Sequence, residues 1–140
     1  MNRLLLPPGW PRPKGYANGV AARGAMVFVA GQIGWTPEGV FEASDLPGQA
    51  RQAFQNTLDV LTEGGAGPEH MVRQTWYITD KRAYLDNARA VGEAYRDVFG
   101  RNFPAMAVVE VTALMEDQAL IEIETTAVIP DDRPDEEEQS

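Results

Sequence analysis

The chain has 140 residues, 44% of them hydrophobic and 24% charged, a composition typical of one soluble globular domain. Twenty-one acidic residues outnumber 12 basic residues, and the net charge of −9 opposes binding to a polyanion such as RNA. Cysteine is absent, which excludes a disulfide, a thiolate nucleophile and a zinc–thiolate site. His70 is the one histidine, so a Ser-His-Asp triad would have to use His70 itself.

Nothing in the sequence predicts a membrane segment or a leader. No apolar run approaches the roughly 20 residues that span a bilayer. Pro7 and Pro8 interrupt the N-terminal leucines, unlike the longer apolar core of a signal peptide. We therefore expect a cytoplasmic protein without a membrane partner.

The N-terminal third predicts strands. Four prolines predict an extended, irregular segment over residues 6–15. Residues 20–23 and 26–30 predict the two strands of a hairpin that turns at Gly24, and residues 40–42 predict a short third strand.

Two apolar stripes at helical spacing follow. The first, over residues 46–61, has Ser44 or Asp45 as its cap and Gly64 as its stop. The second covers residues 84–98 and begins after Thr79-Asp80. Strands are predicted over residues 71–79, between the helices, and then over residues 105–114 and 119–129.

This order predicts an α+β fold in which two helices pack on one face of a mixed sheet. The other face must then stay solvated or meet another subunit. In the strand over residues 105–114, the small side chains of Ala107 and Val109 are expected to face the helices, and Met106 and Val108 to face away. Carboxylates on that second face favour an oligomer interface.

The last ten residues form a separate acidic segment. Residues 131–140 hold six acids and one arginine and no apolar side chain, so they cannot bury enough surface to fold. We expect one folded domain over residues 1–130 and a disordered tail over residues 131–140.

Taken singly, the candidate functional residues are ambiguous. Gly31 ends a strand without a following helix, which fits either a simple turn or a backbone N–H that receives an anion. Glu122 and Glu124 share one strand face and could simply be solvated. His70 is interpreted as a surface or capping residue.

In combination, the motifs of the chain resemble the Rid family (reactive intermediate deaminase, also called YjgF-like) over about residues 7–130. The matching segments are Lys14-Gly15-Tyr16, Val27-Phe28-Val29-Ala30-Gly31-Gln32-Ile33-Gly34, Gln49-Ala50-Arg51-Gln52-Ala53-Phe54-Gln55-Asn56, Tyr77-Ile78-Thr79-Asp80, Phe103-Pro104-Ala105 and Ile121-Glu122-Ile123-Glu124. The resemblance implies a chorismate-mutase-like α+β fold and a homotrimer with three clefts between subunits. It also implies hydrolysis of enamines and imines to a keto acid and ammonia, with no metal or cofactor.

The resemblance also implies a set of site residues. By position, Glu122 orients the attacking water, and Tyr16 is an aromatic lid over the substrate. A backbone amide of Gly31 helps to hold the substrate carboxylate. Deaminating members carry an arginine directly after the Pro-Ala pair, where it binds the substrate carboxylate. Here Ala105 is followed by Met106, whose thioether cannot replace a guanidinium.

The missing arginine leaves several interpretations open. Arg101, nearest in sequence, could take over; the substrate could lack a carboxylate; or the deaminase activity could be lost. Met106 and Trp35 would make the cleft more apolar and favour a larger or neutral ligand. A small-molecule hydrolase and a non-catalytic binding protein both fit, whereas the net charge and the single histidine argue against a nuclease.

Overall fold

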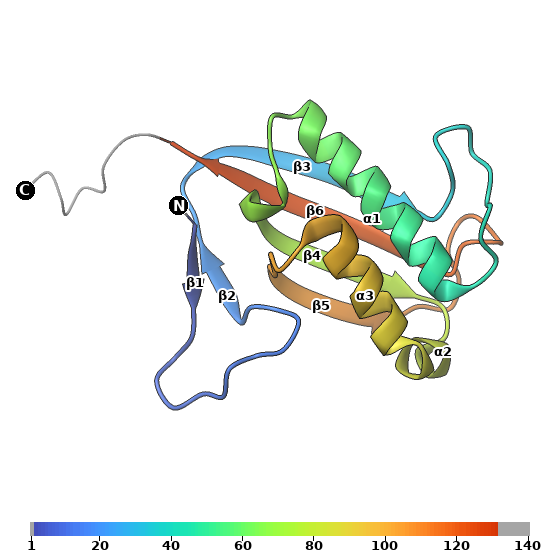
Figure 1. The fold of residues 1–140 in the computed structure, drawn as a ribbon, viewed down its shortest axis with the longest axis horizontal. Coiled ribbons are helices and arrows are strands. Elements are labelled where there is room, and N and C mark those ends of the chain that lie inside the picture. The colour runs from blue at the N-terminus through green and yellow to red at the C-terminus, as the bar shows by residue number, and fades with distance from the viewer. Residues whose placement is uncertain (1, 132–140) are drawn as a thin grey trace, which may run out of the picture.

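The computed structural model describes residues 2–131, so the predicted tail lies outside the described residues except for Asp131. A four-stranded mixed sheet has the order β3-β6-β4-β5, and a separate two-stranded sheet pairs β1 with β2 (Figure 1). The strands are β1 (Arg3–Leu5), β2 (Gly19–Ala21), β3 (Gly24–Ile33), β4 (Met71–Ile78), β5 (Ala105–Glu110) and β6 (Ile121–Pro130). The helices are α1 (Leu46–Glu63), α2 (Lys81–Asp86) and α3 (Ala88–Phe99), with a 3₁₀ turn at Pro68–His70. The predicted α+β class is confirmed.

Helices α1 and α3 lie side by side on one face of the sheet, as predicted (Figure 1). The core between them and the sheet centres on Phe54, which is fully buried. Its ring centroid lies 5.3 Å from that of Trp76, 5.4 Å from Tyr95 and 5.5 Å from Phe99. This aromatic cluster holds both helices on β4. No helix in residues 2–131 is long and apolar enough to cross a bilayer.

The helix boundaries follow from local side-chain chemistry. Asp45 caps α1 by accepting a hydrogen bond from the backbone N–H of Gly48, and Asp80 caps α2 in the same way. The single helix predicted after Asp80 is instead split at Asn87. The Asn87 side chain donates a 2.8 Å hydrogen bond to the Ala83 carbonyl, which interrupts the helix at that point.

The predicted hairpin around Gly24 is wrong. β2 pairs with β1, whereas β3 pairs with β6. Gly24 has φ of +148°, and a Cβ built there would lie 1.9 Å from the Ile129 carbonyl oxygen. The glycine thus permits close contact with the end of β6 rather than a turn between neighbouring strands.

Two smaller expectations also fail. No strand forms over residues 40–42, because Val40 and Thr36 bond to each other and close a local turn. In β5, Met106 and Val108 face the helices, and Ala107 and Val109 face away, the reverse of the prediction. The larger side chains of β5 fill the space at the edge of the core.

The sheet face away from the helices carries apolar side chains without cover. Phe28 on β3 is 69% exposed and Val109 on β5 is 42% exposed. Glu122 and Glu124 lie on the same face, as predicted, while their neighbours Ile121 and Ile123 are buried under the helices. Such a mixed apolar and acidic face fits contact with another protein surface better than full solvation.

We predict that this face assembles the protein as a homotrimer. Light scattering at micromolar concentration should give about three times the chain mass of 15.4 kDa. Phe28→Glu should shift the mass toward that of one chain, because it places a charge in the contact. Leu85→Glu, which changes an exposed side chain on α2, should leave the assembly intact. A monomeric wild type would contradict the prediction.

Candidate functional site

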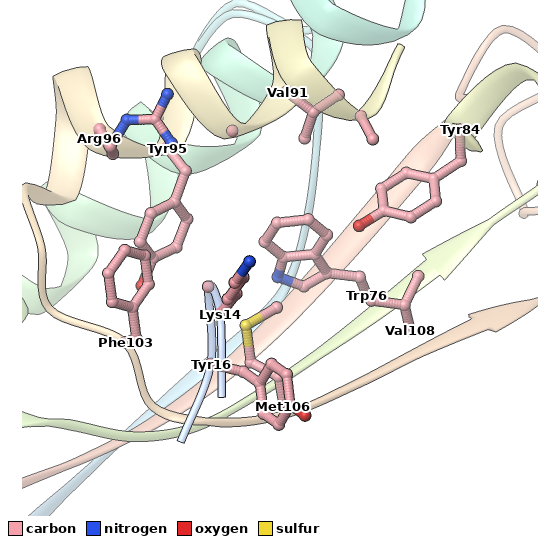
Figure 2. A pocket seen from close by; sticks show the side chains of 13 residues that line it. Lys14, Tyr16, Trp76, Tyr84, Val91, Tyr95, Arg96, Phe103, Met106 and Val108 are labelled. Carbon is pink, nitrogen blue, oxygen red and sulfur yellow. The ribbon is translucent and has the colours of Figure 1, made fainter. Parts of the chain in front are cut away.

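A cavity of about 350 Å³ lies between the β5 edge of the sheet, the α2–α3 segment and residues 14–16 of the N-terminal segment (Figure 2). Five of its 13 lining residues are aromatic, and it is large enough for a small organic ligand. The lining residues on which the argument depends are Lys14, Tyr16, Trp76, Tyr84, Arg96 and Met106. Met106 and Tyr16, two residues predicted for the site, thus share one cavity.

The inner wall of the cavity is an extension of the core. Trp76 is buried, and its indole N–H donates a 3.0 Å hydrogen bond to the side chain of Gln74, which is fully buried. Tyr95 stacks on Phe103 at 5.4 Å, and its hydroxyl donates to the Asn102 carbonyl. These contacts give the aromatic rings one orientation, so this wall is preformed.

The outer wall depends on a backbone contact far from it in sequence. The N–H of Ala17 donates a 2.9 Å hydrogen bond to the Pro104 carbonyl, and Ala17 forms an isolated parallel bridge with Ala105. This bridge holds Lys14 and Tyr16 beside the start of β5. Ala105 therefore positions the segment, while its own side chain alternates away from Met106 along the strand.

Glu122 and Gly31 meet on the opposite, open face of the sheet. The β3–β6 register shifts between Val29 and Gln32, which leaves Gly31 in an irregular stretch of the strand. A Cβ built on Gly31 would lie 2.6 Å from Glu122 Oε2, so only glycine permits this close approach of carboxylate and backbone.

The two carboxylates on this face differ in their partners. Glu124 accepts a 2.6 Å hydrogen bond from the Tyr77 hydroxyl, which raises the pKa of Tyr77 because the bond to the carboxylate favours the protonated phenol. Within residues 2–131, Glu122 has neither a hydrogen bond nor an ion pair with its side chain. Of the pair, Glu122 is the carboxylate that is available to a substrate or a water.

The structure separates the predicted site residues into groups. Tyr16 and Met106 lie on the helix side of the sheet, and Gly31 and Glu122 on the open side. Trp35 lies elsewhere, with its ring against Phe41 at 5.9 Å. One protomer therefore does not bring all of these residues around one small molecule.

Arg101 lines a different cavity, of about 380 Å³, together with His70. The arginine that shares the cavity with Met106 is Arg96, which the sequence interpretation missed, as it missed Lys14 as a cavity residue. Arg96 directly follows Tyr95 in the second apolar stripe, and that position was the available signal. In the described part of the chain, no group of His, Asp and Glu side chains could hold a metal ion.

Comparison with known proteins agrees with this fold and these motifs. Residues 11–129 match the family described as endoribonuclease L-PSP. A RutC family protein of Pyrococcus abyssi is 35% identical over 118 residues, which cover 84% of this chain and 89% of the relative. The 2-iminobutanoate/2-iminopropanoate deaminase of Salmonella typhimurium is 34% identical over 113 residues, covering 81% and 86%.

A solved structure shows the same architecture. A protein of unknown function of the conserved Rid family from Yersinia pestis superposes with a TM-score of 0.81 at 28% identity, covering 91% of this chain and 98% of that one. The fold and motifs together define a small α+β protein of the YjgF type. The chain belongs to the Rid family, and the resemblance found in its sequence is confirmed.

The buried Trp76–Gln74 pair yields a test of how the cavity wall is held. Trp76→Phe should lower the free energy of unfolding by about 1–3 kcal/mol, because it leaves the buried Gln74 oxygen without a donor. Gln74→Met should also lower the free energy of unfolding. The double variant should lower it by less than the sum of the two single changes, because both remove the same hydrogen bond. Urea unfolding at one protein concentration measures these values. Trp35→Phe is the matched control, expected within about 0.5 kcal/mol of the wild type. Strict additivity would contradict the coupling.

Proposed function

We propose that this protein works in the cytoplasm as a homotrimeric hydrolase of unstable imines or enamines, with its ligand bound in a cleft between two protomers. The proposal rests on family membership and on relatives of about 30% identity that are named 2-iminobutanoate/2-iminopropanoate deaminases. The observation that carries the intersubunit cleft is the separation of the two half-sites on opposite faces of the sheet. A second protomer is what could bring an open face against a cavity.

In the proposed reaction, a water oriented by Glu122 attacks the carbon of the C=N bond. Glu122 accepts one proton from the water as the C–O bond forms and passes this proton to the substrate nitrogen, which gives a neutral carbinolamine. The hydroxyl group of the carbinolamine then loses its proton to Glu122, which transfers it to the nitrogen as the C–N bond breaks, so that ammonia and a carbonyl product are released. A backbone N–H at Gly31 would stabilise the developing negative charge.

Two features of the open face support Glu122 rather than Glu124 in this role. The Tyr77 hydroxyl already donates a hydrogen bond to Glu124, whereas Glu122 has no such partner among the described residues. Glu122 also lies directly against Gly31, so a water bound to its carboxylate would be close to the backbone. The proposal therefore uses one carboxylate and one backbone donor.

Met106 favours a second candidate function, a non-catalytic protein that binds the same class of molecule. An arginine would form two charge-assisted hydrogen bonds to a substrate carboxylate, and a thioether forms none. Small 2-imino acids should therefore bind weakly at this position. For the nuclease activity in the family description, the net charge of −9 is unfavourable.

We predict that the wild type releases ammonia slowly from 2-iminopropionate and that Met106→Arg raises the rate about tenfold or more, because it supplies a cation for the carboxylate. Glu122→Gln added to Met106→Arg should remove this gain. Ammonia release from freshly generated 2-iminopropionate is the measurement.

Glu124→Gln in the Met106→Arg background is the matched control, since that carboxylate is already bound to Tyr77. It should preserve the gain. Equal losses with Glu122→Gln and Glu124→Gln, or brisk wild-type turnover that ignores Glu122→Gln, would contradict the assigned role of Glu122. Binding of 2-iminopropionate without ammonia release by any variant would favour the non-catalytic alternative.

A further inference from the structure

The charges that line the cavity beside Met106 have one sign. Lys14 and Arg96 contribute two cations, and none of the described residues that line it is acidic. The whole chain carries a net charge of −9, so the charge of the cavity is opposite in sign to that of the molecule. The cavity on the open face, by contrast, has both a cation, Arg73, and a carboxylate, Glu124, in its lining. A cavity of this kind attracts an anion even though the protein as a whole repels one.

Neither cation is neutralised within the described residues. Lys14 and Arg96 have no ion pair or side-chain hydrogen bond there, whereas Arg89 and Glu93, on the same helix as Arg96, pair at 3.7 Å. Both side chains are among those that line the cavity (Figure 2). They can therefore bind a ligand without first breaking an internal ion pair.

The guanidinium of Arg96 lies over Gly92. A Cβ built on Gly92 would lie 3.3 Å from the Arg96 guanidinium, so the side chain of Arg96 runs back along α3 across this glycine. Gly92 and Arg96 are four residues apart and share one face of the helix, and both line the cavity. The cation of Arg96 is thus held on the cavity face of α3.

The body of the cavity suits a planar apolar group. Trp76 and Tyr84 meet edge to face, with centroids 6.3 Å apart, and Met106 adds a polarisable thioether beside them. The Tyr84 hydroxyl has no hydrogen-bond partner among residues 2–131 and points toward Trp76 (Figure 2). Burial raises the pKa of Tyr84, so its hydroxyl remains a donor at neutral pH.

We propose that this cavity selects a carboxylic acid with an aromatic body, and that Lys14 and Arg96 bind its carboxylate in place of an arginine at position 106. The aromatic body would lie between Trp76, Tyr84 and Met106. This inference rests on the proposed function in one respect, that the cavity holds the ligand of the protein. It changes the substrate class from small imino acids to larger aromatic ones.

Binding of stable probes to the full chain tests the inference without any turnover. Isothermal titration calorimetry compares 3-phenylpropionate with propionate, which lacks the ring, and with 3-phenylpropanamide, which lacks the charge. We expect 3-phenylpropionate to bind at least about tenfold more tightly than either one. Equal affinities for 3-phenylpropionate and propionate would overturn the proposed selection for an aromatic group. Equal affinities for the acid and the amide, or no measurable binding of the acid, would overturn the carboxylate site.

Charge variants locate the carboxylate. Lys14→Gln and Arg96→Gln should each weaken the affinity for 3-phenylpropionate by roughly five- to tenfold. The affinity for 3-phenylpropanamide should stay unchanged. Arg89→Gln, on the same helix but outside the cavity, is the matched control and should leave both affinities unchanged. Circular dichroism is the control that tests whether each variant is folded. An unchanged acid affinity in both cavity variants would overturn the assignment.

The outcome is separable from the proposed hydrolysis. Ammonia release that depends on Glu122, together with no preference for 3-phenylpropionate, would leave the hydrolase standing and overturn this inference. Charge-dependent binding of 3-phenylpropionate without ammonia release from 2-iminopropionate by the wild type or by Met106→Arg would support this inference and overturn the hydrolysis of small imino acids.

Discussion

The hydrogen bond between the indole of Trp76 and the side chain of Gln74 is the contact on which the centre of the molecule depends. Both side chains are buried on the inner face of β4, and each would be costly to bury alone. The bond sets the orientation of the indole, which then contacts Phe54 on one side and Tyr84 on the other. Core and cavity therefore share a wall, and the cavity takes its shape from core packing rather than from a loop.

The sheet divides the chemistry of the chain between its two faces. The helix side has a cavity with aromatic side chains and two cations in its lining, and the open side has a free carboxylate against a glycine. Alternation of side chains along β5 and β6 produces this division, because neighbours in a strand point to opposite faces. In one chain Met106 and Glu122 therefore lie on opposite sides of the sheet, and only the proposed cleft between two copies would bring both to one substrate. The methionine at position 106, where the family resemblance implies an arginine, affects only the helix side of that proposed cleft.

Features that depend on neighbours in sequence could be predicted, and features that depend on distant contacts could not. The capping of α1 by Asp45 is local, and so is the motif that contains Met106. The partner of β3 could not be found in this way, because only contact with the distant β6 explains Gly24. The place of Arg96 beside the apolar stripe could be read locally, but its place in a cavity could not. That place requires the segment that Ala17 holds against β5.

The position of β6 in the sheet has a consequence for how the protein is made. This strand lies between β3 and β4, yet residues 121–130 are the last that the structure describes in regular structure. On the ribosome, β3, α1 and β4 emerge without the strand that joins them, and part of their apolar surface remains uncovered until β6 has been synthesised. Pairing of Gly24 with Pro130 closes a loop of more than a hundred residues, which slows folding relative to local pairing. A nascent chain that lacks β6 therefore exposes apolar strand edges, which is the kind of surface that leads to aggregation.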